Sequence, residues 1–299
     1  MHVVVAGASG FLGRHLIEAL HEHGHTTTSL VRREPTTDTE SRWDPASGQI
    51  DPQAIEHADV VVNAAGSPTI GNPHSKRWAR TLRESRVTTT TTLAEAIASS
   101  ERKPAFLAGN AVAGYGDHGD ARVTEAGDCR SHTLMAEVTR AWEAAAQPAI
   151  ESGARVCVLR TSPIMDRESE PLHILQHLFR LGLGGRVGSG RQYFPMVSLR
   201  DWLAGVVHLS EHSEASGRFN LCCPQTPTNA EFTRALARAV GRPAFLPVPS
   251  AAIRVGAGPL APELLGSVNL VPQALMDTGF AFRDRDVTAV LAAGLAGLR

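Results

Sequence analysis

The sequence contains few cysteines, tyrosines and lysines for its 299 residues. Its four cysteines, Cys129, Cys157, Cys222 and Cys223, have a spacing that fits neither a zinc site nor a disulfide framework, so we expect reduced thiols and no metal. No apolar run is long enough to span a membrane. The N-terminus shows no signal peptide, which predicts a cytoplasmic protein. The net charge of −1 gives no overall field that would attract nucleic acid or an anionic membrane.

Short apolar runs and helical patterns alternate through the first half of the chain. The expected strands cover 2–6, 26–31, 42–44, 59–63, 105–108 and 156–159, and the expected helices cover 11–23, 76–99 and 134–147. Strands that alternate with helices imply right-handed crossovers. The pattern therefore predicts an α/β fold with a doubly wound parallel sheet of the Rossmann type.

The composition changes near residue 165, where a glycine-rich stretch and a proline-rich stretch follow. We expect helices over 171–181 and 229–240, the second capped by Thr228 or Asn229, and a strand over 219–223. This division predicts a Rossmann domain over 1–165 with a return segment at 199–222. Residues 166–299 form the predicted smaller, C-terminal substrate lobe.

Three glycines, Gly7, Gly10 and Gly13, follow the first expected strand and open the first helix. Such a turn lets the backbone approach a pyrophosphate, and the helix N-terminus supplies N–H donors and a favourable dipole. The predicted cofactor contacts in this turn are Gly7, Ser9, Gly10, Phe11, Leu12 and Gly13. The alternative is a tight strand-to-helix turn without a ligand.

Arginines stand at the end of the second expected strand, where NAD-binding folds usually hold an acidic residue against the ribose hydroxyl. Arg32 and Arg33 can pair with a 2′-phosphate, which favours NADP(H) as the cofactor. The alternative is a solvated pair of surface arginines. After the fourth strand, the small residues Ala64, Ala65 and Gly66 leave room for the adenine-ribose side of the cofactor. A packing turn is the alternative there.

Several stretches of the chain together resemble a known family. They are GASGFLG (7–13), RWDP with GQID (42–51), NAAGSPTI (63–70), RESRVTTTTTL (83–93), LGLGGRVGSGRQYF (181–194), TNAEF (228–232) and TGFAFR (278–283). These stretches resemble the atypical "epimerase family" branch of the extended short-chain dehydrogenase/reductase superfamily, whose members carry a distinctive C-terminal extension. The resemblance covers nearly the whole chain.

The resemblance implies NADP(H) binding and places further residues at the site. Cofactor contacts are implied for Arg86 and for the segment Thr161, Ser162 and Pro163, besides the glycine turn, Arg32, Ala65 and Gly66. The resemblance also implies that Arg191, Gln192 and Asp201 face the substrate cleft.

The sequence departs from this superfamily in its catalytic residues. The usual Tyr-x-x-x-Lys pair is absent, because the two tyrosines, Tyr115 and Tyr193, have no lysine four residues further on. Asn110 stands where the superfamily usually has a serine. Tyr115 is the candidate general acid or base, with Asn110 as a hydrogen-bonding partner of the substrate. The alternative is that Tyr115 only packs or lines the pocket.

Two functions follow from these observations. The first is an NADP(H)-dependent reductase-like or epimerase/dehydratase-like enzyme, an oxidoreductase or isomerase acting on a small polar substrate, with sugar nucleotides as one class. The second is a non-catalytic NADP(H)-binding sensor or scaffold. We expect a monomer or homodimer, and we read the histidines at 21–25 and at 173 and 177 as surface or packing residues rather than a zinc site.

Overall fold

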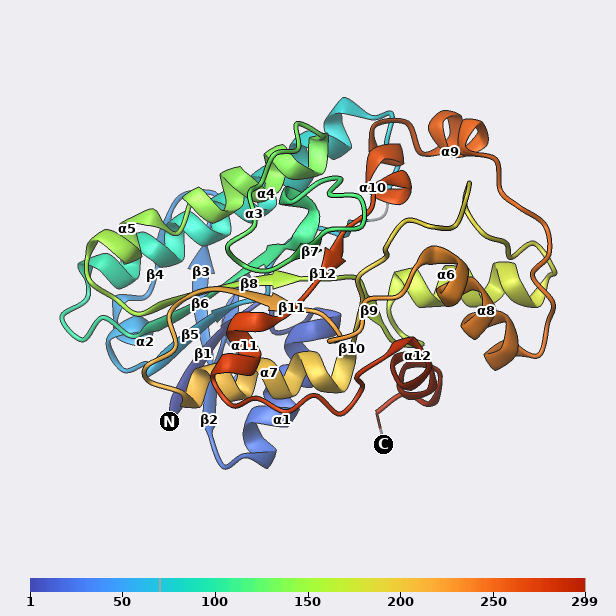
Figure 1. Ribbon diagram of the computed structural model, residues 1–299. Helices are drawn as coiled ribbons and strands as arrows, with labels where there is room; N and C mark the ends of the chain where they lie inside the picture. Colours follow the sequence, from blue (N-terminus) through green and yellow to red (C-terminus); the bar gives the residue numbers. More distant parts are fainter. Residues whose placement is uncertain (70, 299) are drawn as a thin grey trace.

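The computed structural model describes residues 1–69 and 71–298, and its main element is an eight-stranded sheet (Figure 1). The strand order is β11-β8-β6-β5-β1-β2-β3-β4, and all neighbours are parallel except β3 and β4. This order confirms the expected doubly wound parallel sheet. The strands are β1 (His2–Ala6), β2 (Thr26–Val31), β3 (Glu40–Asp44), β4 (Gln49–Ile50), β5 (Val60–Asn63), β6 (Ala105–Ala111), β8 (Val156–Thr161) and β11 (Gly217–Leu221).

Helices cover both faces of this sheet, as Figure 1 shows. On one face lie α1 (Phe11–Glu22) and α7 (Leu199–Glu211), and on the other lie α3 (Lys76–Ser99), α4 (Leu134–Ala144) and α5 (Gln147–Glu151). The short α2 (Pro52–Glu56) precedes β5. Alternate residues of each strand point to opposite faces, so every central strand is apolar on both sides and both helical layers bury it.

The run of threonines at 88–92 lies within the helix α3 although β-branched residues favour strands. Tertiary contacts explain this. The Thr90 hydroxyl accepts hydrogen bonds from Asn63 Nδ2 and from Trp142 Nε1, both at 2.9 Å. The Thr89 hydroxyl donates to the Ser85 carbonyl one turn earlier. The run therefore connects α3 to β5 and α4.

The helix expected over 134–147 ends earlier, at Ala144, and α5 starts at Gln147. Pro148 explains the break, because its ring has no N–H and would clash with the carbonyl of residue 144 in a continuous helix. A helix start is one place where proline fits well, so Pro148 lies in the first turn of α5.

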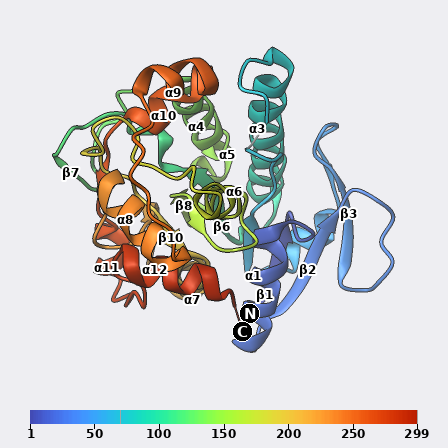
Figure 2. The same cartoon turned by 90° about the vertical axis from the view of Figure 1, so that its right-hand side faces the viewer.

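The C-terminal lobe lies at the end of the sheet where the parallel strands finish, and Figure 2 views the molecule from that side. Its core joins α6, α8 and α12. The helices of the lobe are α6 (Glu170–Arg180), α8 (Asn229–Val240), α9 (Ser250–Ala257), α10 (Ala261–Leu265) and α12 (Val287–Ala296). The short strand pairs are β9 (Ile164–Met165) with β10 (Val197–Ser198) and β7 (Arg122–Val123) with β12 (Asn269–Leu270), and α11 (Gln273–Asp277) packs against β11 of the large sheet. The two short 3-10 helices are η1 (Val112–Gly114) and η2 (Gly258–Leu260).

The chain enters the lobe twice, because α7 and β11 return to the large sheet between the two lobe segments. Of the two caps that the sequence allowed, Thr228 is the one that caps α8, with a reciprocal pair of hydrogen bonds to Glu231. None of the helices in the described part of the chain has both the length and the apolar character needed to cross a membrane.

Candidate cofactor site

The turn between β1 and α1 requires glycine at two positions. Gly7 has a φ of +83°, and a Cβ atom there would lie 2.7 Å from the backbone of Ala64 and Ala65. A Cβ atom on Gly13 would overlap the Gly7 carbonyl oxygen. Gly10 is exposed and closes the turn by donating its N–H to the Gly7 carbonyl at 2.9 Å. The turn is therefore compact on the protein side and open where a ligand would approach.

The N-terminus of α1 has no side-chain cap and no acidic residue in its first turn. Side chains cap α2, α3, α4, α7, α8 and α12, whereas α6 and α9 resemble α1 in having no side-chain cap. The free N–H groups of the first helical turn and the helix dipole suit an anion. This end of α1 thus has the donors that a pyrophosphate needs.

Asn63 fixes the loop that packs against the glycine turn. The side chain is 1% exposed, donates to Thr90, and accepts a hydrogen bond at 3.0 Å from the N–H of Ala65. The small residues Ala64, Ala65 and Gly66 therefore stand at the edge of the sheet beside Gly7, where the sequence predicted the adenine-ribose side of the cofactor.

The structure distinguishes the two arginines that follow β2. Arg33 forms a two-pronged ion pair with Glu40 of β3, with N–O distances of 2.8 and 2.5 Å, and this pair lowers the pKa of Glu40 to about 2. Arg32 is exposed and takes part in no ion pair of the described residues. Arg32 is therefore the cation free to meet a 2′-phosphate.

At the end of β8, the segment Thr161 to Pro163 contains a buried polar atom without a partner. Ser162 is 2% exposed, and its hydroxyl has no hydrogen-bond partner in the described chain. Thr161, by contrast, accepts a hydrogen bond from Trp202 Nε1 at 3.1 Å. An unpaired buried hydroxyl costs free energy unless a ligand or water satisfies it. Ser162, the open α1 terminus and Arg32 together fit the cofactor that the sequence predicts.

Arg86 of α3 is a buried cation without a carboxylate partner in the described residues. Its guanidinium donates to the carbonyls of Leu82 and Ser67 at 3.0 and 3.2 Å and stacks at 5.1 Å from the ring centre of Trp142. Burial lowers the pKa of Arg86 to about 10. A Cβ atom on Gly66 would lie 3.5 Å from Arg86 Cζ, so this cation lies directly beneath the predicted cofactor loop.

The predicted catalytic groups face the α4 side of the sheet. Asn110 is 4% exposed, donates to the Thr139 carbonyl at 3.2 Å and accepts the N–H of Ala111. Tyr115 is 1% exposed, and its hydroxyl donates to Asn220 and accepts from Arg160, both at 2.8 Å. Burial raises the pKa of Tyr115 to about 12. Their catalytic roles stay predictions, and both side chains already have protein partners.

A pocket of about 640 Å³ lies next to these two residues, between α4 and the outer strands β8 and β11. Its polar end holds an ion-pair cluster that sequence reasoning missed. Arg160 is paired with Glu143 of α4 at 3.0 Å, and Glu143 also accepts from Arg218 at 2.6 Å.

The buried face of α4 carries Met135, Ala136, Val138 and Thr139, and the helix contains neither tyrosine nor lysine. Alternation along β8 could have placed Arg160 beside Val158, facing α4.

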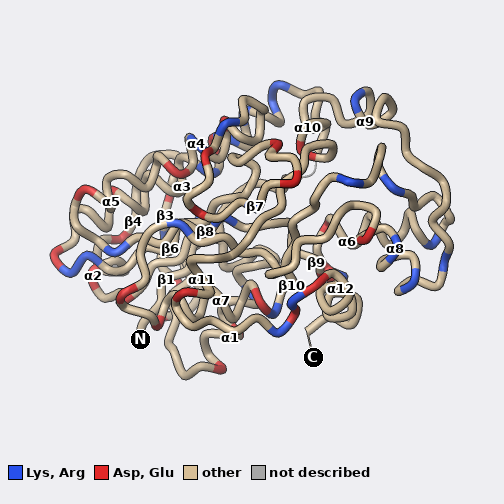
Figure 3. The backbone as a smooth tube through the Cα atoms, in the orientation of Figure 1, with Lys and Arg blue, Asp and Glu red and all other residues tan. Residues whose placement is uncertain are grey.

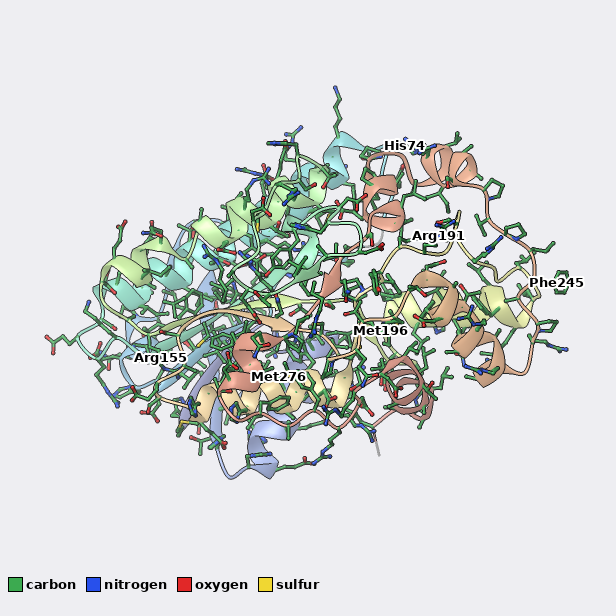
Figure 4. All side chains as sticks on the ribbon, viewed as in Figure 1. His74, Arg155, Arg191, Met196, Phe245 and Met276 are labelled. Carbon is green, nitrogen blue, oxygen red and sulfur yellow. The ribbon has the colours of Figure 1, made fainter. Side chains whose placement is uncertain are left out.

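The three residues that the resemblance assigned to the substrate cleft lie in different surroundings. Arg191 is exposed in the loop between α6 and β10 (Figure 4), and Gln192 donates to the Val187 carbonyl of the same loop. Asp201 is 1% exposed, and its oxygens accept the N–H groups of Arg283 and Asp284. Asp201 therefore holds the C-terminal segment on α7, and its position does not agree with substrate contact.

No group of three or more His, Cys, Asp or Glu side chains in the described ranges could hold a metal ion. The fold and the open glycine turn define a dinucleotide-binding Rossmann protein of the extended short-chain dehydrogenase/reductase type. The model of the "NAD dependent epimerase/dehydratase family" matches residues 3–222, and the chain belongs to this family. A second model, a domain of unknown function, matches residues 248–293.

The relatives and solved structures that follow match nearly the whole length of this chain. The epimerase family protein Mb2239 of Mycobacterium bovis is 38% identical over 97% of this chain and 96% of its own. The structure of human epimerase family protein SDR39U1 with NADPH has a TM-score of 0.88 at 30% identity and covers both chains fully. A nucleoside-diphosphate sugar epimerase from Corynebacterium glutamicum has a TM-score of 0.81 at 31% identity, covering 99% of this chain and 58% of its own.

Proposed function

We propose that the chain binds NADP(H) and acts as a reductase-like or epimerase/dehydratase-like enzyme on a small polar substrate. The observation that carries the proposal is the open glycine turn with a free cation at the end of β2. Gly7 and Gly13 let the backbone of the turn approach a pyrophosphate, and the uncapped α1 offers N–H donors to it. Arg32 is paired with no carboxylate among the described residues, so its guanidinium can bind a 2′-phosphate. The human relative solved with NADPH supports this choice of cofactor.

The roles of the residues follow from their positions. The nicotinamide supplies hydride chemistry when the cofactor is bound. The α1 terminus holds the pyrophosphate, Arg32 holds the 2′-phosphate, and Ser162 hydrogen-bonds to the ligand at the end of β8. Arg191, exposed in the loop between α6 and β10, provides a cation for the substrate. Sugar nucleotides are the first substrate class to test, because the relative from Corynebacterium glutamicum carries that name.

Replacing Arg32 with alanine tests the cofactor. We expect the Arg32→Ala variant to bind NADPH about ten- to a hundredfold more weakly, because a charge-assisted hydrogen bond to the 2′-phosphate is lost. Binding of NADH should not change. The matched control is Arg33→Ala, whose side chain is already paired with Glu40 and should matter less. Isothermal titration of both cofactors measures the effect, and equal affinity of the wild type for NADPH and NADH would overturn the assignment.

Turnover separates the enzyme from the alternative function. Purified protein with NADPH is incubated with panels of carbonyl compounds, and with sugar nucleotides followed by product chromatography. If Tyr115 is the general acid or base, the Tyr115→Phe variant loses turnover, and its stability falls by about 2 kcal/mol because Arg160 and Asn220 lose a buried partner. Full turnover in a folded Tyr115→Phe protein would show that Tyr115 only lines the pocket.

The alternative function is a sensor or scaffold that binds NADP(H) without turnover. One observation favours it: the helix α4 has neither tyrosine nor lysine, so the usual proton-transfer pair is missing. Tight NADPH binding without any turnover across both panels would support this alternative over the enzyme.

A further inference from the structure

Two segments of the C-terminal lobe carry basic charge without any acidic residue. Residues 171–192 and 232–262 contain seven arginines and no aspartate or glutamate, in a chain whose net charge is −1. Figure 3 shows these basic positions along α6, α8 and the loops beside them. The two segments therefore carry a formal charge of +7, with Glu170, Glu231 and Glu263 directly outside them.

The same two segments carry most of the exposed large apolar side chains. Eleven such side chains are exposed in the described residues, and seven of them lie in these segments. The most exposed at this end of the lobe are Phe245 at 75%, Leu181 at 74%, Leu183 at 60% and Leu246 at 52%. Single exposed leucines are common in soluble proteins, but a group of them next to one another indicates a contact surface.

Backbone contacts bring the two segments together at one place. Val248 donates to the Arg186 carbonyl at 2.8 Å, and Gly188 donates to the Val248 carbonyl at 2.9 Å. Gly185 packs against the backbone of Leu246, where a Cβ atom would not fit. We call the resulting surface the lobe tip and define it by Leu181, Leu183, Phe245 and Leu246 together with Arg180, Arg186 and Arg242.

The lobe tip projects from the molecule. Figure 4 shows Phe245 at the outer end of the lobe with its ring directed away from the protein. The pocket beside Tyr115 and the one lined by Arg167, Glu168, Glu170, His173 and Ile174 include no residue of the lobe tip. Arg180, Arg186 and Arg242 are exposed and form no ion pair with any described residue. The tip thus combines projecting apolar side chains with unpaired cations.

We propose that the lobe tip docks on an anionic lipid surface. Projecting leucine and phenylalanine side chains enter the boundary between headgroups and acyl chains, and the arginines pair with anionic headgroups around them. An anionic bilayer offers both an apolar interior for Leu183 and Phe245 and anionic groups for the unpaired arginines, which is the combination that the tip presents. The glycine turn between β1 and α1 contributes no residue to the tip, so docking at the tip does not use the predicted NADP(H) site.

Vesicle co-sedimentation of the full chain tests the proposal. The probes are phosphatidylcholine vesicles and vesicles in which about one third of the lipid is phosphatidylserine. We expect binding to the anionic vesicles, weak binding to the neutral ones, and a loss of binding as the salt concentration rises.

Variants of the tip separate its two components. We expect the combined change Arg180→Gln, Arg186→Gln and Arg242→Gln to lower the partition coefficient by more than about tenfold, and the change Leu183→Ser with Phe245→Ser to lower it by at least about tenfold. The matched controls are Arg77→Gln, Arg80→Gln and Arg83→Gln on the exposed face of α3, and Ile150→Ser on α5. Thermal unfolding and NADPH titration confirm that each variant is folded.

Three results would overturn the proposal. The first is absence of binding to anionic vesicles by the wild type. The second is an equal loss of binding in the control variants, which would indicate unspecific attraction. The third combines two observations: the wild type does not bind vesicles, and the tip variants change the oligomeric state measured by sedimentation velocity. This would show that a second copy of the chain covers the tip.

Discussion

A Gly13→Ala variant is expected to bind NADPH roughly a hundredfold more weakly than the wild type, a loss of about 2.8 kcal/mol of binding free energy. The reason is that the new methyl group would overlap the Gly7 carbonyl oxygen. Either α1 moves away from β1 or the turn opens, and both displace the N–H groups that face the pyrophosphate. The same overlap should lower the free energy of unfolding by about 3 kcal/mol. Isothermal titration and urea unfolding measure the two effects separately.

Two further glycines make this experiment specific. Gly10 is exposed, has an ordinary φ of −77°, and its Cβ atom would lie 3.2 Å from the Gly7 carbonyl oxygen. Gly10→Ala should therefore weaken NADPH binding with a smaller loss of stability, because the methyl group points to the ligand side. Gly256 of α9 has nothing within 4 Å of the place that a Cβ atom would take, so Gly256→Ala serves as the control. It should leave NADPH binding unchanged and raise the free energy of unfolding by at most about 1 kcal/mol. Wild-type affinity in Gly13→Ala would exclude this turn as the cofactor site.

The parallel sheet was predictable from sequence because its central strands are buried on both faces. Residues 2–6 and 60–63 are almost wholly apolar, and glycine or helical patterns follow each of them, so the order of strand and helix can be read directly. The end of α4 and the helical conformation of the threonine run were harder to predict from the sequence. Local propensity argues against threonines 88–92 in a helix, and only the contacts with Asn63 and Trp142 explain them.

The candidate site was predictable where it depends on local backbone and not where it depends on distant partners. The glycine turn follows from neighbouring residues. The difference between Arg32 and Arg33 depends on Glu40, which an adjacent strand brings beside only one of them. Asp201 finds its partners 82 and 83 residues later in the chain, so no spacing rule could have identified its structural role. The lobe tip could not be predicted from the net charge, because that value averages over the whole chain.

The ion-pair cluster beside Tyr115 has a large expected effect on stability. A Glu143→Gln variant should lose about 3 kcal/mol of unfolding free energy, because the buried Arg160 guanidinium, with 6% of its side chain exposed, would have no carboxylate. Arg218 is the other partner of Glu143, and 56% of the Arg218 side chain is exposed. Arg218→Gln should therefore lower the free energy of unfolding by less than about 1 kcal/mol. Urea unfolding compares the two. Equal losses would show that the burial of Arg160 is unimportant.

A double variant shows what the cluster does for function. Replacing the pair by Glu143→Leu and Arg160→Met removes both charges and should return stability to within about 1 kcal/mol of the wild type. In this protein Tyr115 keeps its hydrogen bond to Asn220 but loses the one from Arg160. If the cluster only holds β8, β11 and α4 together, the double variant binds NADPH and turns over substrate like the wild type. If Tyr115 takes part in proton transfer, turnover falls and its pH profile shifts although stability and cofactor affinity are restored.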